Sequence, residues 1–310
     1  MNTKTKTYRS NGKLLLTAEY AVLDGAKALA IPTKYGQSLT VSGNGSNLIN
    51  WKSYNELGEV WFEDVFSIES TSTALSMTSA LKNDISKRLI EILKSTKILN
   101  PGFLSKDIGF DITTHQDFNR LWGLGTSSTL INNIANWANV DAFQLLEQTF
   151  GGSGYDIACA QNDKPITFQL LGNKKPFVEP MDFNPDFKQH LYFVYLNQKQ
   201  NSRDGISVYK KLNKINSEII KNIDDITEAM STCKSLFEFE SLIATHETII
   251  ANLIQQEPIK TRLFSDYKGT VKSLGAWGGD FILATSSNDP TAYFKAKGLN
   301  TVIPYEAMTL

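Results

Sequence analysis

The feature that most constrains the fold of this chain is a glycine-rich turn between a predicted strand and a predicted helix. Residues 108–114 are predicted to form the strand and residues 128–138 the helix, with the sequence GLGTSS at residues 123–128 between them. The free N–H groups and positive dipole end of a helix that starts there favour a phosphate. The alternative is an ordinary glycine turn with a hydroxyl cap.

The two common nucleotide-binding fingerprints are absent from this turn. The pattern G-x-G-x-x-G would require glycine where Ser128 stands, and G-x-x-x-x-G-K-[ST] occurs nowhere in the chain. The signature set of protein kinases is absent too. The sequence therefore supports neither a Rossmann dinucleotide site nor a Walker loop.

Two charged stretches are further candidates for chemistry. Lys13 directly precedes an apolar run, with Glu19 and Tyr20 beyond it, and is either a fixed positive charge or simply solvated. Asp156 follows a glycine-containing turn and precedes small apolar residues. Such an aspartate caps a helix or, beside a lysine, accepts a proton from a substrate hydroxyl.

The length of 310 residues indicates about two domains. The order of elements is mixed without strict alternation, which favours an α+β fold. Polar, proline-containing residues 172–189 are predicted to be a connector, so we place the domain boundary after residue 186. The expected strands and helices are strands at 8–16, 36–42, 47–52, 59–62, 191–196, 280–285 and 301–304, and helices at 78–96, 141–150, 212–226, 236–253 and 291–297.

Charge and composition limit the partners. Lys and Arg number 31 against 32 for Asp and Glu, a formal net charge of -1, so nothing indicates a nucleic-acid or anionic-membrane partner. The N-terminal apolar run is too short for a signal peptide, and no stretch is long enough to span a membrane, so we expect a cytoplasmic protein. Cys159 and Cys233 lack the spacing of a zinc site or a disulfide framework.

Four stretches in chain order resemble the signature motifs of the GHMP kinase superfamily, which includes galactokinase, homoserine kinase, mevalonate kinase and phosphomevalonate kinase. They are GKLLLTAEYAVLDG at 12–25, WGLGTSS at 122–128, GSGYDIA at 152–158 and KSLGAWGGD at 272–280. The resemblance implies a two-domain fold. Residues 1–186 would form an ATP-binding and catalytic domain like domain 2 of ribosomal protein S5, and residues 187–310 a ferredoxin-like C-terminal domain.

The resemblance also implies an ATP- and Mg²⁺-dependent phosphoryl transfer, with roles for individual residues. Asp156 would be the base or orienting group and Lys13 would contact the acceptor and the transferred phosphoryl group. The nucleotide phosphates would meet Gly123, Leu124, Gly125, Thr126, Ser127 and Ser128, and Mg²⁺ would meet Ser127 and Glu147. The acceptor would meet Glu19, Tyr20, Arg203, Gly275, Gly278 and Gly279.

The motifs limit the identity of the acceptor only in part. Tyr20 stands where mevalonate kinases usually carry histidine, while GSGYDIA and Asp280 resemble phosphomevalonate kinase, so we expect phosphomevalonate or mevalonate. Trp277 replaces a glycine of the usual motif and predicts a narrower acceptor pocket. A kinase for another alcohol or sugar, a non-catalytic ligand-binding or regulatory relative, and a diphosphomevalonate decarboxylase stay open, as does a homodimer.

Overall fold

The structure, a computed structural model, describes residues 4–70, 75–104, 108–199 and 202–310. The chain divides into two compact units. Unit 1 consists of Met1–Gly12, Tyr35–Arg120 and Gly125–Gln161, and unit 2 of Lys13–Lys34, Leu121–Leu124 and Asn162–Leu310. Both units are discontinuous in sequence, so they are not equivalent to the predicted division at residue 186, which stays a prediction.

Unit 1 is built on a sheet in which the strands follow the order β5-β4-β3-β6-β2, with β1 paired to β2. The pair β3 and β6 is parallel, and β2–β6, β3–β4 and β4–β5 are antiparallel. The strand bounds are β1 (Lys6–Leu15), β2 (Ala28–Gly43), β3 (Leu48–Tyr54), β4 (Val60–Ser70), β5 (Leu75–Ser79) and β6 (Phe110–Gln116).

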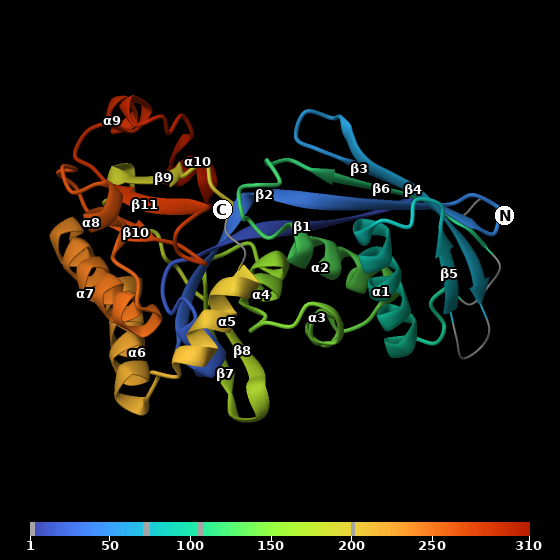
Figure 1. Ribbon diagram of the computed structural model, residues 1–310, viewed down its shortest axis with the longest axis horizontal. Helices are drawn as coiled ribbons and strands as arrows, with labels where there is room; N and C mark the ends of the chain where they lie inside the picture. The colour runs from blue at the N-terminus through green and yellow to red at the C-terminus, as the bar shows by residue number, and fades with distance from the viewer. Residues whose placement is uncertain (1–3, 71–74, 105–107, 200–201) are drawn as a thin grey trace. The chain divides into compact units, whose positions relative to one another are not determined.

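Four helices cover one face of this sheet (Figure 1). They are α1 (Asp84–Leu99), α2 (Thr126–Ala138), α3 (Ala142–Thr149) and α4 (Tyr155–Gln161). On β3, Ile49 and Trp51 are buried in the core shared with the helices, whereas Asn50 and Lys52 are exposed. This alternation is expected for a sheet with one covered face.

The predicted helix at 78–96 is wrong at its start, because residues 75–79 form β5 and α1 starts at Asp84. The Asn83 side chain caps α1 by accepting a hydrogen bond from the Ser86 amide at 2.8 Å. The helix was predicted to start too early because Leu81 and Ile85 continue the helical spacing of apolar residues toward the N-terminus. Both side chains are exposed, so they are not part of a buried helix face.

Asp64 on β4 connects this strand to β5 and α1 through its buried carboxylate. One oxygen accepts hydrogen bonds from the hydroxyls of Ser79 and Ser86, and the other from the amides of Val65 and Leu81. Burial alone would raise the pKa of Asp64, but these hydrogen bonds together lower it below its usual value.

We expect Asp64→Ala to lower the free energy of unfolding by about 1–3 kcal/mol, because several buried donors lose their acceptor. Since the pKa of Asp64 is lower in the folded state, this stabilisation is present above the unfolded pKa and is lost as pH falls through the folded one. Urea denaturation from pH 7 towards pH 2 should show the difference from the wild type shrinking. Glu63→Ala, at an exposed ion pair on the same strand, should change little.

Unit 2 contains two sets of paired strands. Residues 28–30 of β2 pair with β7 (Ile166–Leu171), which pairs with β8 (Lys175–Pro180). The other set is an antiparallel sheet of order β10-β11-β9-β12. Its strands are β9 (Leu191–Tyr195), β10 (Val271–Ser273), β11 (Phe281–Thr285) and β12 (Val302–Pro304).

Helices lie on both sides of the four-stranded sheet, with α9 above it and α7 below it in Figure 1. All five residues of β11 are buried, as this arrangement requires. The helices of unit 2 are α5 (Ser202–Leu212), α6 (Ser217–Thr232), α7 (Leu236–Ile254), α8 (Ile259–Leu263), α9 (Thr291–Ala296) and α10 (Tyr305–Met308), with short 3₁₀ turns η1 (Ala21–Asp24), η2 (Gly172–Lys174) and η3 (Lys188–His190).

The α+β architecture predicted from the sequence is confirmed. The two long amphipathic helices exist as α6 and α7, and the strand after the glycine-rich stretch exists as β11. The predicted bounds of 212–226 for the first helix are wrong at both ends, because Leu212 ends α5 and α6 continues to Thr232. The connector predicted at 172–189 is wrong in part, because it contains β8, and α5 was not predicted. In β8 the burial alternates only weakly, which fits a polar edge strand that sequence patterns miss.

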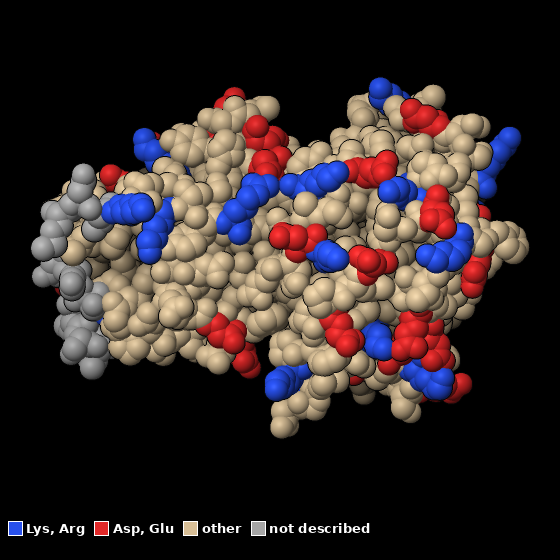
Figure 2. Space-filling view, turned by 180° about the vertical axis from the view of Figure 1, so that it is seen from behind, with Lys and Arg blue, Asp and Glu red and all other residues tan. Residues whose placement is uncertain are grey.

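The surface agrees with the near-neutral charge. Figure 2 shows basic and acidic side chains interspersed over the face in view, without a large patch of one sign. Among the described residues, no helix has both the length and the apolar character needed to cross a membrane.

Candidate functional site

The second half of the GLGTSS stretch forms the N-terminus of α2. Gly125 is the N-cap at φ 96°, a conformation that glycine adopts without strain, and no side chain caps the first turn. The hydroxyls of Ser128 and Thr129 instead donate to the Gly125 carbonyl, at 2.9 and 3.0 Å. The amides of the first turn are therefore not used by a capping side chain, and Ser127 beside them is exposed.

The first half of the same stretch lies in unit 2, against Lys13. The Lys13 ammonium donates to the Gly123 carbonyl at 2.7 Å, and its amide donates to the Leu124 carbonyl at 3.0 Å. Gly123 has φ 70°, and a Cβ there would lie 2.2 Å from a carboxylate oxygen of Asp280. Only glycine fits this position, and the sequence-predicted pair of Lys13 and the glycine turn is brought together.

Asp156 lies in the first turn of α4, where a negative charge is favourable. One carboxylate oxygen accepts from the amide of Ile157 at 3.1 Å, and the residue is half-buried. Asp156 therefore lies inside the first turn of α4 and not at its N-cap position, and its role as a functional carboxylate stays a prediction.

A buried polar network that the sequence analysis missed joins α2, α4 and β1 within unit 1. Asn132 donates to Ser10 at 2.9 Å and accepts from Gln161 at 3.0 Å, while Ser10 donates to Asn133 at 2.8 Å. The signal was two adjacent asparagines inside an apolar helix. Their hydrogen bonds fix the helix that follows the glycine turn relative to the helix that carries Asp156.

The predicted Mg²⁺ ligands are both exposed oxygen donors. Ser127 is on the first turn of α2 and Glu147 is on the outer side of α3. A hydroxyl and a carboxylate have the chemistry that Mg²⁺ prefers, with substrate phosphates completing the coordination. In the described part of the chain, no group of three or more His, Cys, Asp or Glu side chains is arranged to hold a metal ion by itself.

The C-terminal glycine motif forms the turn between β10 and β11. Gly275, Trp277, Gly278 and Asp280 all have left-handed φ angles. Trp277 is 2% exposed, so its indole packs into the protein and does not line an open surface. The narrower acceptor pocket expected from this substitution stays a prediction. Gly279 is buried, whereas Gly275 and Gly278 are partly exposed.

Glu19 is not at a surface. Its carboxylate is fully buried in unit 2 and forms an ion pair of 2.5 Å with Lys272, which is also fully buried. Glu247 and His246 of α7 complete the cluster, with Glu247 accepting from the amide of Ser273 at 3.0 Å. The predicted acceptor contact of Glu19 does not fit this burial, and a positioning role fits it better.

Burial dominates the titration of this cluster. It raises the pKa of Glu19 and raises that of Glu247 to about 7, with Lys272 partly opposing both shifts. Burial and then the charge of Lys272 hold the pKa of His246 well below its usual value. His246 is therefore neutral, and its Nε2 accepts a hydrogen bond from the Ala18 amide at 2.9 Å, which puts the ring proton on Nδ1.

The segment before α5 supplies a cation to the C-terminal motif. Lys199 is 3.4 Å from Asp280, so it pairs with a carboxylate of that motif. The side chain of Arg203 lies outside the described residues, so its expected acceptor contact stays a prediction.

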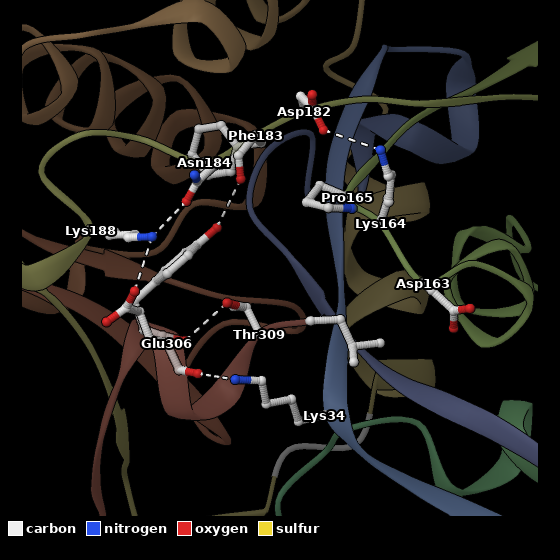
Figure 3. A pocket seen from close by; sticks show the side chains of 12 residues that line it. Lys34, Asp163, Lys164, Pro165, Asp182, Phe183, Asn184, Lys188, Glu306 and Thr309 are labelled. Atoms are coloured by element: carbon white, nitrogen blue, oxygen red, sulfur yellow. Dashed lines mark hydrogen bonds and ion pairs between the residues drawn. The ribbon is translucent and has the colours of Figure 1, made fainter.

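Unit 2 also contains an open cavity of about 390 Å³ (Figure 3). Five of its charged lining residues are already paired: Lys188 with Glu306, Lys164 with Asp182, and Lys34 with the Glu306 carbonyl. None of the residues predicted from the motifs lines it. We therefore do not identify this cavity with the candidate transfer site.

Comparison with known proteins addresses the fold. No protein-family model matches the chain, and no curated protein matches its sequence. Among solved structures, the Methanococcus jannaschii mevalonate kinase is similar with a TM-score of 0.68 and 18% identity, covering 97% of each chain. The Streptococcus pneumoniae phosphomevalonate kinase in complex with phosphomevalonate and AMPPNP is similar with a TM-score of 0.67 and 14% identity, covering 98% of each chain.

A galactokinase is similar as well. The Lactococcus lactis galactokinase complexed with galactose has a TM-score of 0.63 and 12% identity, covering 97% of this chain and 94% of that one. These neighbours all belong to one superfamily, the one that the four sequence motifs resemble, and each is covered over nearly its full length. The chain has the fold of the GHMP kinases.

Proposed function

We propose that this protein transfers the terminal phosphoryl group of ATP, with Mg²⁺, to a small-molecule acceptor of the mevalonate type, phosphomevalonate or mevalonate, in the cytoplasm. The observation that carries the proposal is the glycine turn. Its last residues start α2 without a side-chain cap, and its first residues are hydrogen-bonded to Lys13. Proteins hold and neutralise phosphates with amides at helix N-termini and with lysine ammonium groups.

The proposed roles of the other residues follow from their chemistry and exposure. Asp156 would accept the proton of an acceptor hydroxyl or orient the acceptor. Ser127 and Glu147 would hold Mg²⁺ together with the nucleotide phosphates, and the ion would neutralise charge on those phosphates. Gly275 and Gly278 are partly exposed backbone positions that would face the acceptor.

The acceptor class rests on relatives and on motif details. The Streptococcus pneumoniae neighbour is described with phosphomevalonate and AMPPNP, and an L. major mevalonate kinase with R-mevalonate. The galactokinase neighbour is described with galactose, so a sugar acceptor is the main competing outcome. Identities of 12–18% leave the choice of acceptor to experiment.

The test is a phosphorylation panel with purified protein, labelled ATP and Mg²⁺, offering mevalonate, phosphomevalonate, homoserine and sugars. We expect transfer to mevalonate or phosphomevalonate and none to the rest, with Lys13→Met as the negative control. Lys221→Met, at an exposed ion pair on α6, is the matched control and should keep full activity. Transfer to a sugar alone would refute the acceptor class.

Two other results would overturn the phosphotransferase proposal. ATP binding without transfer to any acceptor, or no ATP binding at all, would favour a non-catalytic ligand-binding or regulatory protein. Loss of the carboxylate carbon from the product would instead identify a decarboxylase.

A further inference from the structure

The N-terminal motif contains a strained turn. Ala18 and Tyr20 have φ angles of 64° and 63°, in the left-handed region that non-glycine residues rarely occupy. Such a conformation persists only where the surroundings fix it, and it is often found where geometry matters for function. Here the Ala18 amide is held by His246, and Glu19 is held by Lys272.

The side chain of Tyr20 forms its contacts within the protein. Its hydroxyl donates to the Ala276 carbonyl at 2.8 Å, and its ring stacks on Tyr209 of α5 with centroids 5.6 Å apart. A Cβ on Gly205 would lie 2.3 Å from the Tyr20 hydroxyl, so glycine is required at that point of α5. Tyr20 is 7% exposed, which leaves its hydroxyl little access to an acceptor.

Ala276 lies in the middle of the turn between β10 and β11. Ser273, at the end of β10, forms hydrogen bonds with α7, the helix that also binds Ala18. Glu247 accepts from both the amide and the hydroxyl of Ser273, while its neighbour His246 accepts from Ala18. The N-terminal turn and the start of the glycine turn thus share α7 as a support. The hydrogen bond from Tyr20 to Ala276 joins the two turns directly.

We propose that Tyr20 is a positioning residue that fixes the Gly275–Gly279 turn through the Ala276 carbonyl. This assignment rests on the proposed function, since that turn would face the acceptor. Tyr20 then acts on the acceptor through the turn, in contrast to the direct contact expected from the sequence. Glu19, Lys272 and His246 hold the strained backbone from which Tyr20 reaches Ala276.

The test compares Tyr20→Phe with Tyr209→Phe by hydrogen-exchange mass spectrometry of the full-length protein. Tyr209→Phe is a matched control, because it removes the hydroxyl of the other ring in the stacked pair. The hydrogen bond lost in that variant is to Asp24 and not to the glycine turn. We expect Tyr20→Phe to speed exchange in residues 274–279 by about fivefold, as for the loss of one hydrogen bond. Tyr209→Phe should leave that segment unchanged.

The kinetic readout separates positioning from contact. In Tyr20→Phe we expect the KM for the acceptor to rise by about fivefold together with the faster exchange, and the KM for ATP to change little. A raised acceptor KM with unchanged exchange would mean direct contact and would overturn the proposal. So would equal exchange in the two variants. If no acceptor is phosphorylated by the wild type, the proposed function fails, while the exchange comparison still decides whether Tyr20 fixes the turn.

Discussion

Asp156→Asn is expected to reduce kcat for an alcohol acceptor by about 100-fold to 10 000-fold while the fold survives. The attacking hydroxyl must lose its proton during transfer, and an amide cannot take it. The hydrogen bond from the Ile157 amide is kept, because the asparagine side chain still offers a carbonyl oxygen at the same place. The loss should therefore appear in turnover, with the melting temperature close to that of the wild type.

The size of this effect also reports the acceptor. A phosphate acceptor is already ionised, so Asp156→Asn should cost much less for phosphomevalonate than for mevalonate. Single-turnover rates with saturating ATP measure the transfer step directly. Asp163→Asn, at a carboxylate that lines the cavity of unit 2, is the control and should keep the wild-type rate. Unchanged transfer to an alcohol in Asp156→Asn would show that this carboxylate is not the base.

The parts of the site that follow from short-range sequence were predictable. The strand, glycine turn and helix around residues 110–138 depend on local spacing and on two glycines, and the structure contains them as β6, the turn and α2. Asp156 at the start of a helix followed from its turn context in the same way. These features need no information about distant residues.

The parts that were missed depend on partners far away in sequence. Glu19 looked like an exposed acceptor contact because nothing near it signals burial, yet its partner Lys272 is 253 residues further along the chain. Trp277 interrupts a glycine motif, and nothing in the neighbouring sequence indicates that its indole is buried. Burial of this kind is decided by tertiary packing, and a sequence pattern read in short windows does not contain it.

Lys272→Met is expected to lower the free energy of unfolding by about 3–5 kcal/mol, because it leaves a buried carboxylate without its counter-charge. The ammonium of Lys272 contacts Glu19 at 2.5 Å and Glu247 at 3.5 Å, and all three groups are buried. Methionine matches the length of lysine but supplies no charge and no hydrogen bond. The measurement is chemical denaturation of the full-length protein at neutral pH.

The charge explanation can be separated from simple loss of packing. In Lys272→Met with Glu19→Gln, no buried charge is stranded at position 19, so the double variant should be more stable than Lys272→Met alone. The loss in Lys272→Met should also grow with pH. Without Lys272 the pKa of Glu19 and of Glu247 rises further above the unfolded value of 4.5, and a raised folded pKa means stability that is lost as pH rises.

His246 does not replace the missing cation in this variant. Its Nε2 accepts a hydrogen bond from the Ala18 amide, so a proton there would face that N–H group, and burial alone already lowers its pKa. The pH dependence comes from the two carboxylates. Unfolding midpoints should therefore differ less between wild type and Lys272→Met at pH 5 than at pH 8. A difference that is independent of pH, together with a double variant no more stable than the single one, would show that Lys272 contributes packing and not charge.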